Sequence, residues 1–279
     1  MTGLVLEGGT FRGIFSAGVM DAFIEKEIFF PYIVGVSAGI SNAASYVSMQ
    51  KERNIEILEK YRNDKRYLSA RNFITTKNYF GMDFVFDEIP NVLVPFDYDT
   101  FHSYKGCFLV GVTNAETGRS EFFDGMKDTD KWEYLRATCA IPSAFEPQYI
   151  NGTPYYDGGL SSPICIKKAM RDGCGKNVII LTQPRGFVKK CTAKNVLAAE
   201  AAGRKYPEIK KELLLRHRLY NDRVKLCEEL EQQGKAIIIR PDRPLGSFES
   251  DERVLRANYN HGYIKGLELA ERVSDFMNE

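Results

Sequence analysis

The sequence is short of residues that would hold a metal ion or a disulfide framework. It has six cysteines and three histidines, and no two cysteines form a C-x-x-C pair. Closely spaced cysteine pairs are the usual sign of a zinc site, and an even set of cysteines in a short secreted chain indicates disulfides. We therefore expect no metal site, no cofactor, and free thiols that are mostly buried in a reducing compartment.

Long apolar runs and an excess of one charge are also missing. No stretch approaches the roughly 18 apolar residues of a membrane-spanning helix. The N-terminus lacks the basic and apolar regions of a signal peptide. The formal net charge is only +1, which gives no overall attraction to nucleic acid. These absences predict a cytoplasmic globular protein that binds no nucleic acid, and the sequence carries no signal of its oligomeric state.

Short apolar runs alternate with amphipathic ones along the chain. Buried strands are predicted at residues 3–6, 32–36, 107–113, 178–182 and 236–240. Helices are predicted at residues 14–26, 38–49, 52–65, 131–138 and 251–277, the final one capped by Ser250. This alternation predicts the α/β class, with a mainly parallel sheet covered on both faces. The 279 residues suit a single domain.

Within that domain, residues 185–235 form a mainly helical segment interrupted at Pro207 and richer in basic than acidic residues. Apolar residues such as Leu197 and Leu213 are interspersed among the charges. One interpretation is a helix that docks on an anionic lipid surface. The more ordinary one is a helix that covers the sheet with its outer face in solvent.

A serine in a motif of catalytic nucleophiles stands where a predicted strand passes into a predicted helix. Residues 35–39 read GVSAG, so Ser37 is flanked by Gly35 and Gly39. A sharp turn there exposes the hydroxyl, the glycines permit the strained backbone, and the helix dipole favours negative charge. The motif alone equally suits a serine that caps an ordinary helix.

A glycine-rich loop follows the first predicted strand, where residues 7–13 read EGGTFRG. Successive glycines can direct backbone N–H groups at an anion, although an ordinary tight turn has the same composition. A dinucleotide fingerprint is excluded because Thr10 stands where G-x-G-x-x-G requires its middle glycine. An oxyanion hole is the better use of the loop, since a nucleophile candidate lies one strand–helix unit away.

A nucleophilic serine needs a base within hydrogen-bonding reach. None of the three histidines is flanked by turn residues that would present it at a strand end; they are His102, His217 and His261. Asp157, in the sequence YYDGGL of residues 155–160, stands directly before Gly158 and Gly159. This setting suits a carboxylate held at the end of a strand, although a D-G-G sequence alone is more often only a turn.

Taken together, these elements resemble the patatin-like phospholipase family. Their order is typical of it: a glycine loop after the first strand, G-x-S-x-G after the second, and D-G-G much later. The opening GLVLEGGTFRGIFSAGVMDAF is similar to that of bacterial cytosolic members. The resemblance covers at least residues 3–160 and implies a three-layer α/β/α fold with a serine–aspartate dyad and no histidine.

The resemblance also implies a role for each motif residue. The nucleophile falls on Ser37 and the base on Asp157. The oxyanion loop and the family arginine fall on Gly8, Gly9, Thr10, Gly13 and Arg12. The implied substrate is a lipid or another acyl ester, cleaved by phospholipase A, lysophospholipase or esterase activity. Together with the basic segment 185–235, the resemblance also suggests that the protein contacts the inner face of an anionic membrane peripherally.

The loop departs from the family pattern GGGxRG at one position, because Thr10 replaces the third glycine. Threonine still offers a backbone N–H, but a β-branched residue disfavours positive φ, so we expect altered geometry there. Arg12 has two interpretations: contact with the oxyanion or a lipid phosphate, or a tie between the loop and a carboxylate.

An aspartate base needs its pKa raised by burial, so we expect a partly apolar site. The aromatic stretch of residues 73–101 would line that site or form ordinary core. One alternative is an α/β-hydrolase triad with His261, which needs more strands before the serine than thirty-six residues provide. Another alternative is a non-enzymatic relative that binds a partner or lipid. Loss of Ser37 or Asp157 would have supported it, but both residues are present.

Overall fold

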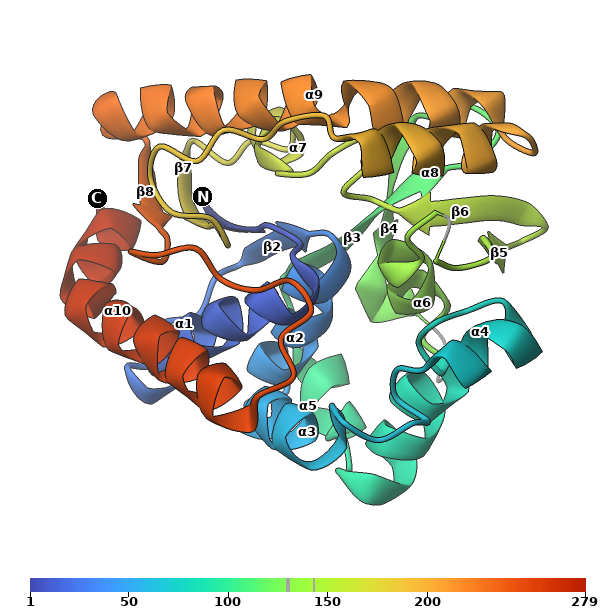
Figure 1. The fold of residues 1–279 in the computed structure, drawn as a ribbon. Helices are drawn as coiled ribbons and strands as arrows, with labels where there is room; N and C mark the ends of the chain where they lie inside the picture. The colour runs from blue at the N-terminus through green and yellow to red at the C-terminus, as the bar shows by residue number, and fades with distance from the viewer. Residues whose placement is uncertain (129–130, 143) are drawn as a thin grey trace.

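The computed structural model describes residues 1–128, 131–142 and 144–279. An eight-stranded sheet with the order β5-β6-β3-β2-β1-β7-β8, and β4 paired to β3, runs through the molecule. Helices cover both of its faces (Figure 1). The strands are β1 (Thr2–Leu6), β2 (Tyr32–Gly35), β3 (Cys107–Asn114), β4 (Ser120–Asp124), β5 (Gln148–Ile150), β6 (Thr153–Asp157), β7 (Lys176–Ile180) and β8 (Ala236–Ile239).

The centre of the sheet is parallel, as the sequence predicted. Strands β3, β2, β1, β7 and β8 run in the same direction. Strands β4 and β6 pair with β3 in antiparallel fashion, and β5 pairs antiparallel with β6 at the edge. Because a parallel sheet is buried on both faces, its strands carry continuous apolar runs such as the AIII of β8. The predicted three-layer α/β/α fold is confirmed.

The two helical layers enclose separate apolar cores. In β1, Leu4 and Leu6 pack into one core and Val5 into the other, because successive side chains of a strand point to opposite faces. Helices α1, α2, α6 and α10 cover the first face, and α7 and the later turns of α9 cover the second (Figure 1). The first turns of α9 pack into the first core through Ile209 and Leu213. The basic segment 185–235 therefore contains, in α9, a helix that covers the sheet.

The helices include several that the sequence did not predict. The α-helices are α1 (Gly13–Glu25), α2 (Ser37–Val47), α3 (Arg53–Tyr61), α4 (Ala70–Thr76), α5 (Tyr98–Ser103), α6 (Glu133–Cys139), α7 (Ile166–Arg171), α8 (Ala193–Gly203), α9 (Pro207–Gln232) and α10 (Glu252–Asn278). Two short 3-10 turns, η1 (Thr10–Arg12) and η3 (Gly125–Lys127), and a π-helix, η2 (Phe84–Leu93), complete the set. No helix in the described part of the chain has both the length and the apolar character to cross a membrane.

Three predictions of detail were wrong. The cap of α10 is Asp251, whose carboxylate accepts the Arg253 N–H, rather than Ser250. Cys107 and Cys191 are exposed rather than buried. Residues 69–100, where the sequence predicted no helix, contain α4, η2 and the start of α5. In that region aromatic side chains at uneven spacing pack against the core, and their periodicity gives no clear helical signal.

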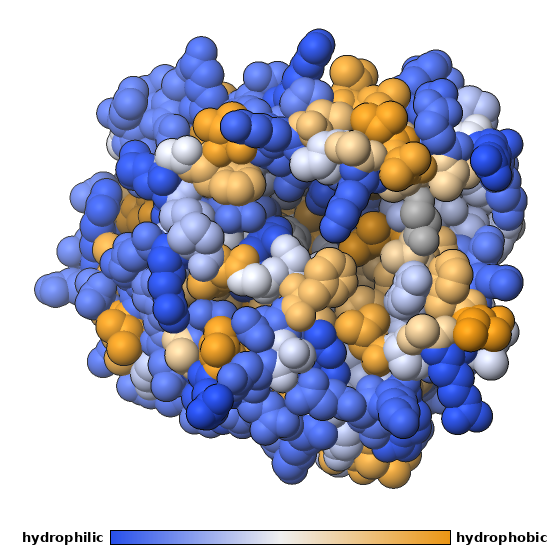
Figure 2. Space-filling model, viewed as in Figure 1, coloured by the Kyte–Doolittle hydropathy of each residue, from blue (hydrophilic) through white to orange (hydrophobic). Residues whose placement is uncertain are grey.

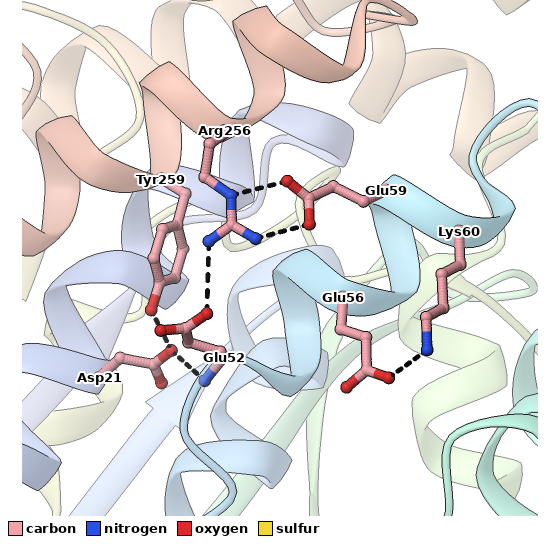
Figure 3. Close-up of polar contacts among 7 residues, drawn as sticks. All are labelled: Asp21, Glu52, Glu56, Glu59, Lys60, Arg256 and Tyr259. Carbon is pink, nitrogen blue, oxygen red and sulfur yellow. Dashed lines mark hydrogen bonds and ion pairs between the residues drawn. The ribbon is translucent and has the colours of Figure 1, made fainter.

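Helix α10 closes the fold by packing along α1. The two backbones approach so closely that a Cβ on Gly262 would lie 2.0 Å from the carbonyl oxygen of Phe15. Arg256 of α10 forms ion pairs with Glu59 and Glu52, which fix it to α3 and to the residue before α3 (Figure 3). This seam holds α1, the helix that follows the glycine-rich loop.

A buried carboxylate lies in the seam. Asp21 is 1% exposed, and its Oδ2 accepts the Tyr259 hydroxyl and the Glu52 N–H, each at 2.7 Å (Figure 3). Burial is the main cause that raises its pKa from 3.8 to about 6, and the two hydrogen bonds oppose the shift. The folded protein therefore binds a proton here that the unfolded chain has already released at the same pH.

We expect the free energy of unfolding to reflect this proton. The contribution of Asp21 is fully favourable below pH ~4 and is lost as pH rises through the folded pKa of about 6. A shift of about two pH units corresponds to about 3 kcal/mol. Asp21→Asn should remove this pH dependence. Relative to the wild type, the free energy of unfolding of the variant should therefore rise by a few kcal/mol from pH 4.5 to pH 7.5. Denaturant unfolding at the two pH values measures this difference.

The matched control is Glu56→Gln, which breaks a surface ion pair with Lys60 (Figure 3). Exposed pairs of this kind contribute little to stability, so the free energy of unfolding of this variant should stay close to that of the wild type at both pH values. Any constant cost of the amide introduced by Asp21→Asn cancels when the two pH values are compared. An equal difference from wild type at both would show that Asp21 does not titrate in this range.

Candidate active site

Ser37 is the first residue of α2 and stands at the strand-to-helix turn that its motif predicted. Its φ is +52°, a left-handed conformation that is strained for a residue with a side chain. Its N–H donates to Thr138 Oγ1 at 2.8 Å, and Thr138 donates to the Gly111 carbonyl. A Cβ on Gly8 would lie 2.8 Å from the Ser37 Cβ. The strained serine is thus held by bonds from outside its helix and by a glycine that leaves room for it.

Strand register brings Asp157 to the same place. Gly35 at the end of β2 pairs with Val110 of β3, and Asp157 at the end of β6 pairs with Val112, two residues further along β3. Ser37 and Asp157 therefore lie at one level beyond the carboxyl end of β2, and the Ser37 hydroxyl is close enough to the Asp157 carboxyl to lower its pKa. The sequence motifs, far apart in the chain, are adjacent in the fold.

The Asp157 carboxylate is buried, at 5% exposure. Burial raises its pKa above the ordinary value of 3.8, while the Arg216 guanidinium, the Gly159 N–H and the Ser37 hydroxyl oppose the rise. The Gly159 N–H donates to Oδ1 at 2.7 Å, and Gly158 continues the tight turn after β6. A carboxylate with a raised pKa is a better proton acceptor than an exposed one.

The glycine-rich loop faces Ser37 from the end of β1. Gly8, Gly9 and Thr10 precede α1, whose first residue is Gly13. Thr10 has φ +52°, a left-handed conformation that costs a residue with a side chain about 1–2 kcal/mol. No partner in the described part of the chain binds the N–H groups of Gly9, Thr10 and, next to Ser37, Ala38.

Arg12 ties the loop to two segments across the sheet. Its Nε donates to Thr182 Oγ1 at 3.3 Å and its Nη1 to the Ser247 hydroxyl. Thr182 also donates its N–H to Glu7 Oε2 at 2.7 Å. Of the two interpretations of Arg12, the structure supports the one in which Arg12 anchors the loop. The anchoring bonds go to the hydroxyl groups of Thr182 and Ser247 rather than to a carboxylate. Burial lowers the pKa of Arg12, and the charge of Glu7 opposes that change.

An apolar cavity of about 170 Å³ opens at Ser37. The aromatic stretch 73–101 supplies much of its wall, together with residues of α2, α3 and α6. Members of that wall include Phe80, Met82, Phe86, Ile89, Phe96 and Trp132. Figure 2 shows hydrophobic side chains gathered around a hollow on the face that carries α8, α9 and α4. The lining can hold a hydrocarbon chain in contact with the serine.

The sequence did not identify Arg216, which reaches the site from α9. Its Nε donates to the Gly159 carbonyl at 2.8 Å, and its charge acts on Asp157. One signal was present: Arg216 lies three residues after Leu213 and four before Tyr220, both buried, and so occupies the inward row of α9. A charged residue in an apolar row indicates a polar partner inside. Gly35 and Gly39 flank Ser37 as predicted, at the end of β2 and in α2.

The histidines lie elsewhere. His261 of α10 is 3.2 Å from Asp242, His102 lies on α5, and His217 on α9 has a buried Nδ1 without a partner in the described residues. None of the three lines the cavity at Ser37. Residues 1–128, 131–142 and 144–279 contain no cluster of three or more groups suited to a metal ion.

The arrangement supports one kind of chemistry. A strained hydroxyl lies beside a buried carboxylate with a raised pKa, nearby backbone N–H groups have no partner among the described residues, and an apolar cavity begins there. These are the parts of nucleophilic acyl transfer: nucleophile, base, oxyanion donors and a place for the acyl group.

Comparison with known proteins yields two matching families. The model described as "Patatin-like phospholipase" matches residues 4–170. A model described as "Domain of unknown function (DUF6363)" matches residues 206–278. The second match begins at the residue before α9 and ends in α10, and so includes Arg216 and β8.

Curated relatives are longer than this chain. "Uncharacterized protein YjjU" of Escherichia coli (strain K12) is 28% identical over 188 residues, which span 65% of this chain and 52% of YjjU. "Lysophospholipase nte1" of Aspergillus terreus is 26% identical over 190 residues, 63% of this chain and 11% of that protein. Among solved structures, VipD from Legionella pneumophila aligns with a TM-score of 0.47 at 12% identity, covering 97% of this chain and 67% of VipD.

Proposed function

Because the chain belongs to the patatin-like phospholipase family, we propose that it is a serine acyl hydrolase that cleaves carboxylic esters of lipids. Ser37 is the nucleophile and Asp157 its base. The observation that carries the proposal is the closeness of these two side chains, which the register of β2, β3 and β6 brings together beside an apolar cavity that Ser37 lines. Phospholipase A, lysophospholipase and general esterase activity all fall within this reaction, and the relatives named lysophospholipase favour a lipid ester.

The first half-reaction forms an acyl-enzyme. Asp157 takes the proton of Ser37 as Oγ attacks the ester carbonyl, and the negative charge develops on the carbonyl oxygen. The N–H groups of Gly9, Thr10 and Ala38 have no partner among the described residues and serve as donors to that oxygen. The C–O bond to the alcohol then breaks, and the alcohol leaves with the proton held by Asp157.

The second half-reaction releases the acid. Water gives a proton to Asp157 and attacks the acyl-enzyme, and the same donors stabilise the second oxyanion. Ser37 recovers its proton as the acid departs. The Arg216 guanidinium lowers the pKa of Asp157 against the rise caused by burial, and so favours the ionised form that can take a proton. Each step of this mechanism is carried by the chain's own residues and water.

The proposal extends to the organisation and location of the protein. Strand β8 and helix α10 belong to the second matched region yet join the same sheet and core, which supports a single domain over residues 1–279. Val196 and Leu197 of α8 are 41% and 71% exposed, near the exposed Lys190 and Lys194. These residues support peripheral contact of a cytoplasmic protein with anionic lipid at the inner membrane face.

The proposal is tested with the purified full chain. It should hydrolyse short p-nitrophenyl esters and acylglycerols, and a fluorophosphonate should block this activity by bonding to one residue. Peptide mass spectrometry should place the adduct on Ser37. A protein that is folded, hydrolyses no ester and takes up no fluorophosphonate would refute the function, and an adduct on another serine would refute the nucleophile.

A further inference from the structure

One charged side chain lines the apolar cavity that opens at Ser37. Among the described residues of the cavity wall, only Arg53, the first residue of α3, carries a charge. Arg53 is buried, at 9% exposure. An ordinary acyl chain is apolar along its whole length and offers no group that would bind a guanidinium inside the cavity. The presence of this charge in the wall therefore calls for a ligand group of another kind.

The guanidinium of Arg53 is incompletely bonded. Its Nη2 donates to the Val94 carbonyl at 2.8 Å, and its Nη1 lies 3.4 Å from Ser45 Oγ. Its Nε is buried and has no partner among the described residues, and none of their carboxylates forms an ion pair with it. Glu56, whose charge acts on Arg53, is bonded to Lys60 instead. Of the five N–H donors of an arginine, several are left for a ligand.

Arg53 nevertheless keeps its charge. Burial is the main cause that lowers its pKa from 12.5 to about 10, and Tyr98 and Glu56 oppose the change, so the guanidinium is ionised at neutral pH. Its central carbon lies 5.1 Å from the ring centroid of Phe96, another residue of the wall. Such a contact offsets part of the cost of burying the charge. Buried cations are normally paired with an anion, and the cavity beside Arg53 leaves room for one.

The cation lies about two helical turns away from the nucleophile. One face of α2 lines the cavity through Ser37, Ser41 and Ala44. Ser45, which Arg53 contacts, follows on the next position of α2. At the usual rise of a helix, the level of Ser45 is about 12 Å from that of Ser37 along the axis. An acyl chain that is bound to Ser37 and follows this face of α2 therefore brings its far end to the guanidinium.

We propose that Arg53 binds a carboxylate at the far end of the acyl chain, so that the preferred substrates are monoesters of dicarboxylic acids whose second carboxyl group is free. This inference rests on the proposed function and specifies the acyl group that the reaction releases. A guanidinium matches a carboxylate through paired N–H donors to its two oxygens. The apolar wall between Ser37 and Arg53 holds the methylene groups that join the two ends.

The test compares three p-nitrophenyl esters that differ only in the acyl chain. They are the decanoyl ester, the monoester of decanedioic acid with its second carboxyl free, and the same monoester with that carboxyl methylated. The wild type should have the highest kcat/KM for the free carboxyl. In Arg53→Met the ratio of the free-carboxyl value to the decanoyl value should fall by ~10–100-fold, the effect of losing a charge-assisted bond. Equal wild-type values for the free and the methylated carboxyl would overturn recognition by charge.

Arg62→Met is the matched control for Arg53→Met. Arg62 is also buried, at 7% exposure, and it donates to the carbonyl groups of Glu249 and Phe248. Its guanidinium carbon lies 4.3 Å from the ring centroid of Phe11, a residue of the wall, but Arg62 itself does not line the cavity. Its replacement should leave the wild-type ratio unchanged. An equal fall of the ratio in both variants would assign the effect to lost packing and refute the carboxylate site.

Two further measurements do not depend on whether Arg53→Met folds. Arg53→Lys keeps the charge without the paired donors and should retain part of the preference. In the wild type itself, the preference for a free carboxyl should depend on chain length. Octanedioyl and decanedioyl esters, which match the separation of about 12 Å, should show it, and the butanedioyl ester, which is too short to reach Arg53, should not. The same preference at every length would overturn the assignment to Arg53.

Failure of this inference is distinct from failure of the function. If the wild type cleaves the decanoyl and free-carboxyl esters with the same ratio as Arg53→Met, the carboxylate site is refuted and the hydrolase stands. If the wild type cleaves none of the three esters and takes up no fluorophosphonate, the function is refuted, and this inference with it.

Discussion

Ser37→Ala should lower ester turnover by ~10³–10⁶-fold, because removal of a catalytic serine leaves only the rate that the oxyanion donors and binding provide. The melting temperature should change little, since only one hydroxyl is lost and the N–H of residue 37 still donates to Thr138. The measurement is kcat/KM for a short p-nitrophenyl ester, with thermal unfolding on the same sample.

Ser41→Ala is the matched control for this variant. Ser41 lies one turn further along α2, lines the same cavity and contacts Cys139 at 3.3 Å. Its loss removes a hydroxyl of the same cavity without touching the dyad, so turnover should stay within ~10-fold of wild type. Wild-type activity in Ser37→Ala would exclude Ser37 as the nucleophile.

Asp157→Asn should lower turnover by ~10²–10⁴-fold, the usual contribution of a general base. The amide keeps the size of the side chain, and its oxygen can still accept the Gly159 N–H. Burial of a neutral group costs less than burial of a carboxylate, so the variant should be at least as stable as wild type at neutral pH. Activity and stability should therefore move in opposite directions.

Acylation is the sharper measurement for this variant. Asp157 is needed to make Ser37 nucleophilic, so the rate of fluorophosphonate labelling should fall along with turnover. Asp124→Asn is the control, because Asp124 also accepts a turn N–H, from Met126, but belongs to β4. Labelling of Asp157→Asn at the wild-type rate would remove Asp157 from the mechanism.

The pH profile gives a further check on the base. Only the ionised carboxylate can take a proton, so the activity of the wild type should rise with pH through the pKa of Asp157. Burial places that pKa above the ordinary 3.8. The acid limb should therefore lie at a higher pH than for an exposed aspartate, and it should be absent from the residual activity of Asp157→Asn.

Local sequence was sufficient for the parts of the site whose geometry is local. The turn at Ser37 follows from an apolar strand, two glycines and a helix, and the break at Pro207 follows from the missing N–H of proline. The parallel centre of the sheet follows from strands that are apolar on both faces. Each of these features depends on residues that are close together in the chain, so hydrophobic periodicity and turn residues are enough to predict it.

Features of the site that depend on residues far apart in the chain could not be predicted from local sequence. The backbone of Thr10 is held in a strained conformation by its surroundings, including Phe11, whose N–H donates to the Ser247 carbonyl, and intrinsic preference pointed away from it. Arg216 reaches Gly159 across 57 positions of the chain, and no local pattern specifies that partner. That Ser37 lies close to Asp157 could be predicted only from the pairing register of β2 and β6 with β3, or from the resemblance to a known family.

The seam between α1 and α10 has a consequence for how the protein folds. Asp21 and Tyr259 are 238 positions apart, and contacts between such distant residues form slowly because a long loop must close. During synthesis the glycine-rich loop and Ser37 emerge early, whereas α10 follows only after β8. Until then Phe15 and Val19 of α1, which are fully buried in the finished protein, remain open to other chains. Until α10 packs on α1, the newly made chain therefore exposes an apolar helix next to an incomplete site. Exposed apolar surface of this kind favours aggregation, which a low concentration of chains or binding to chaperones prevents.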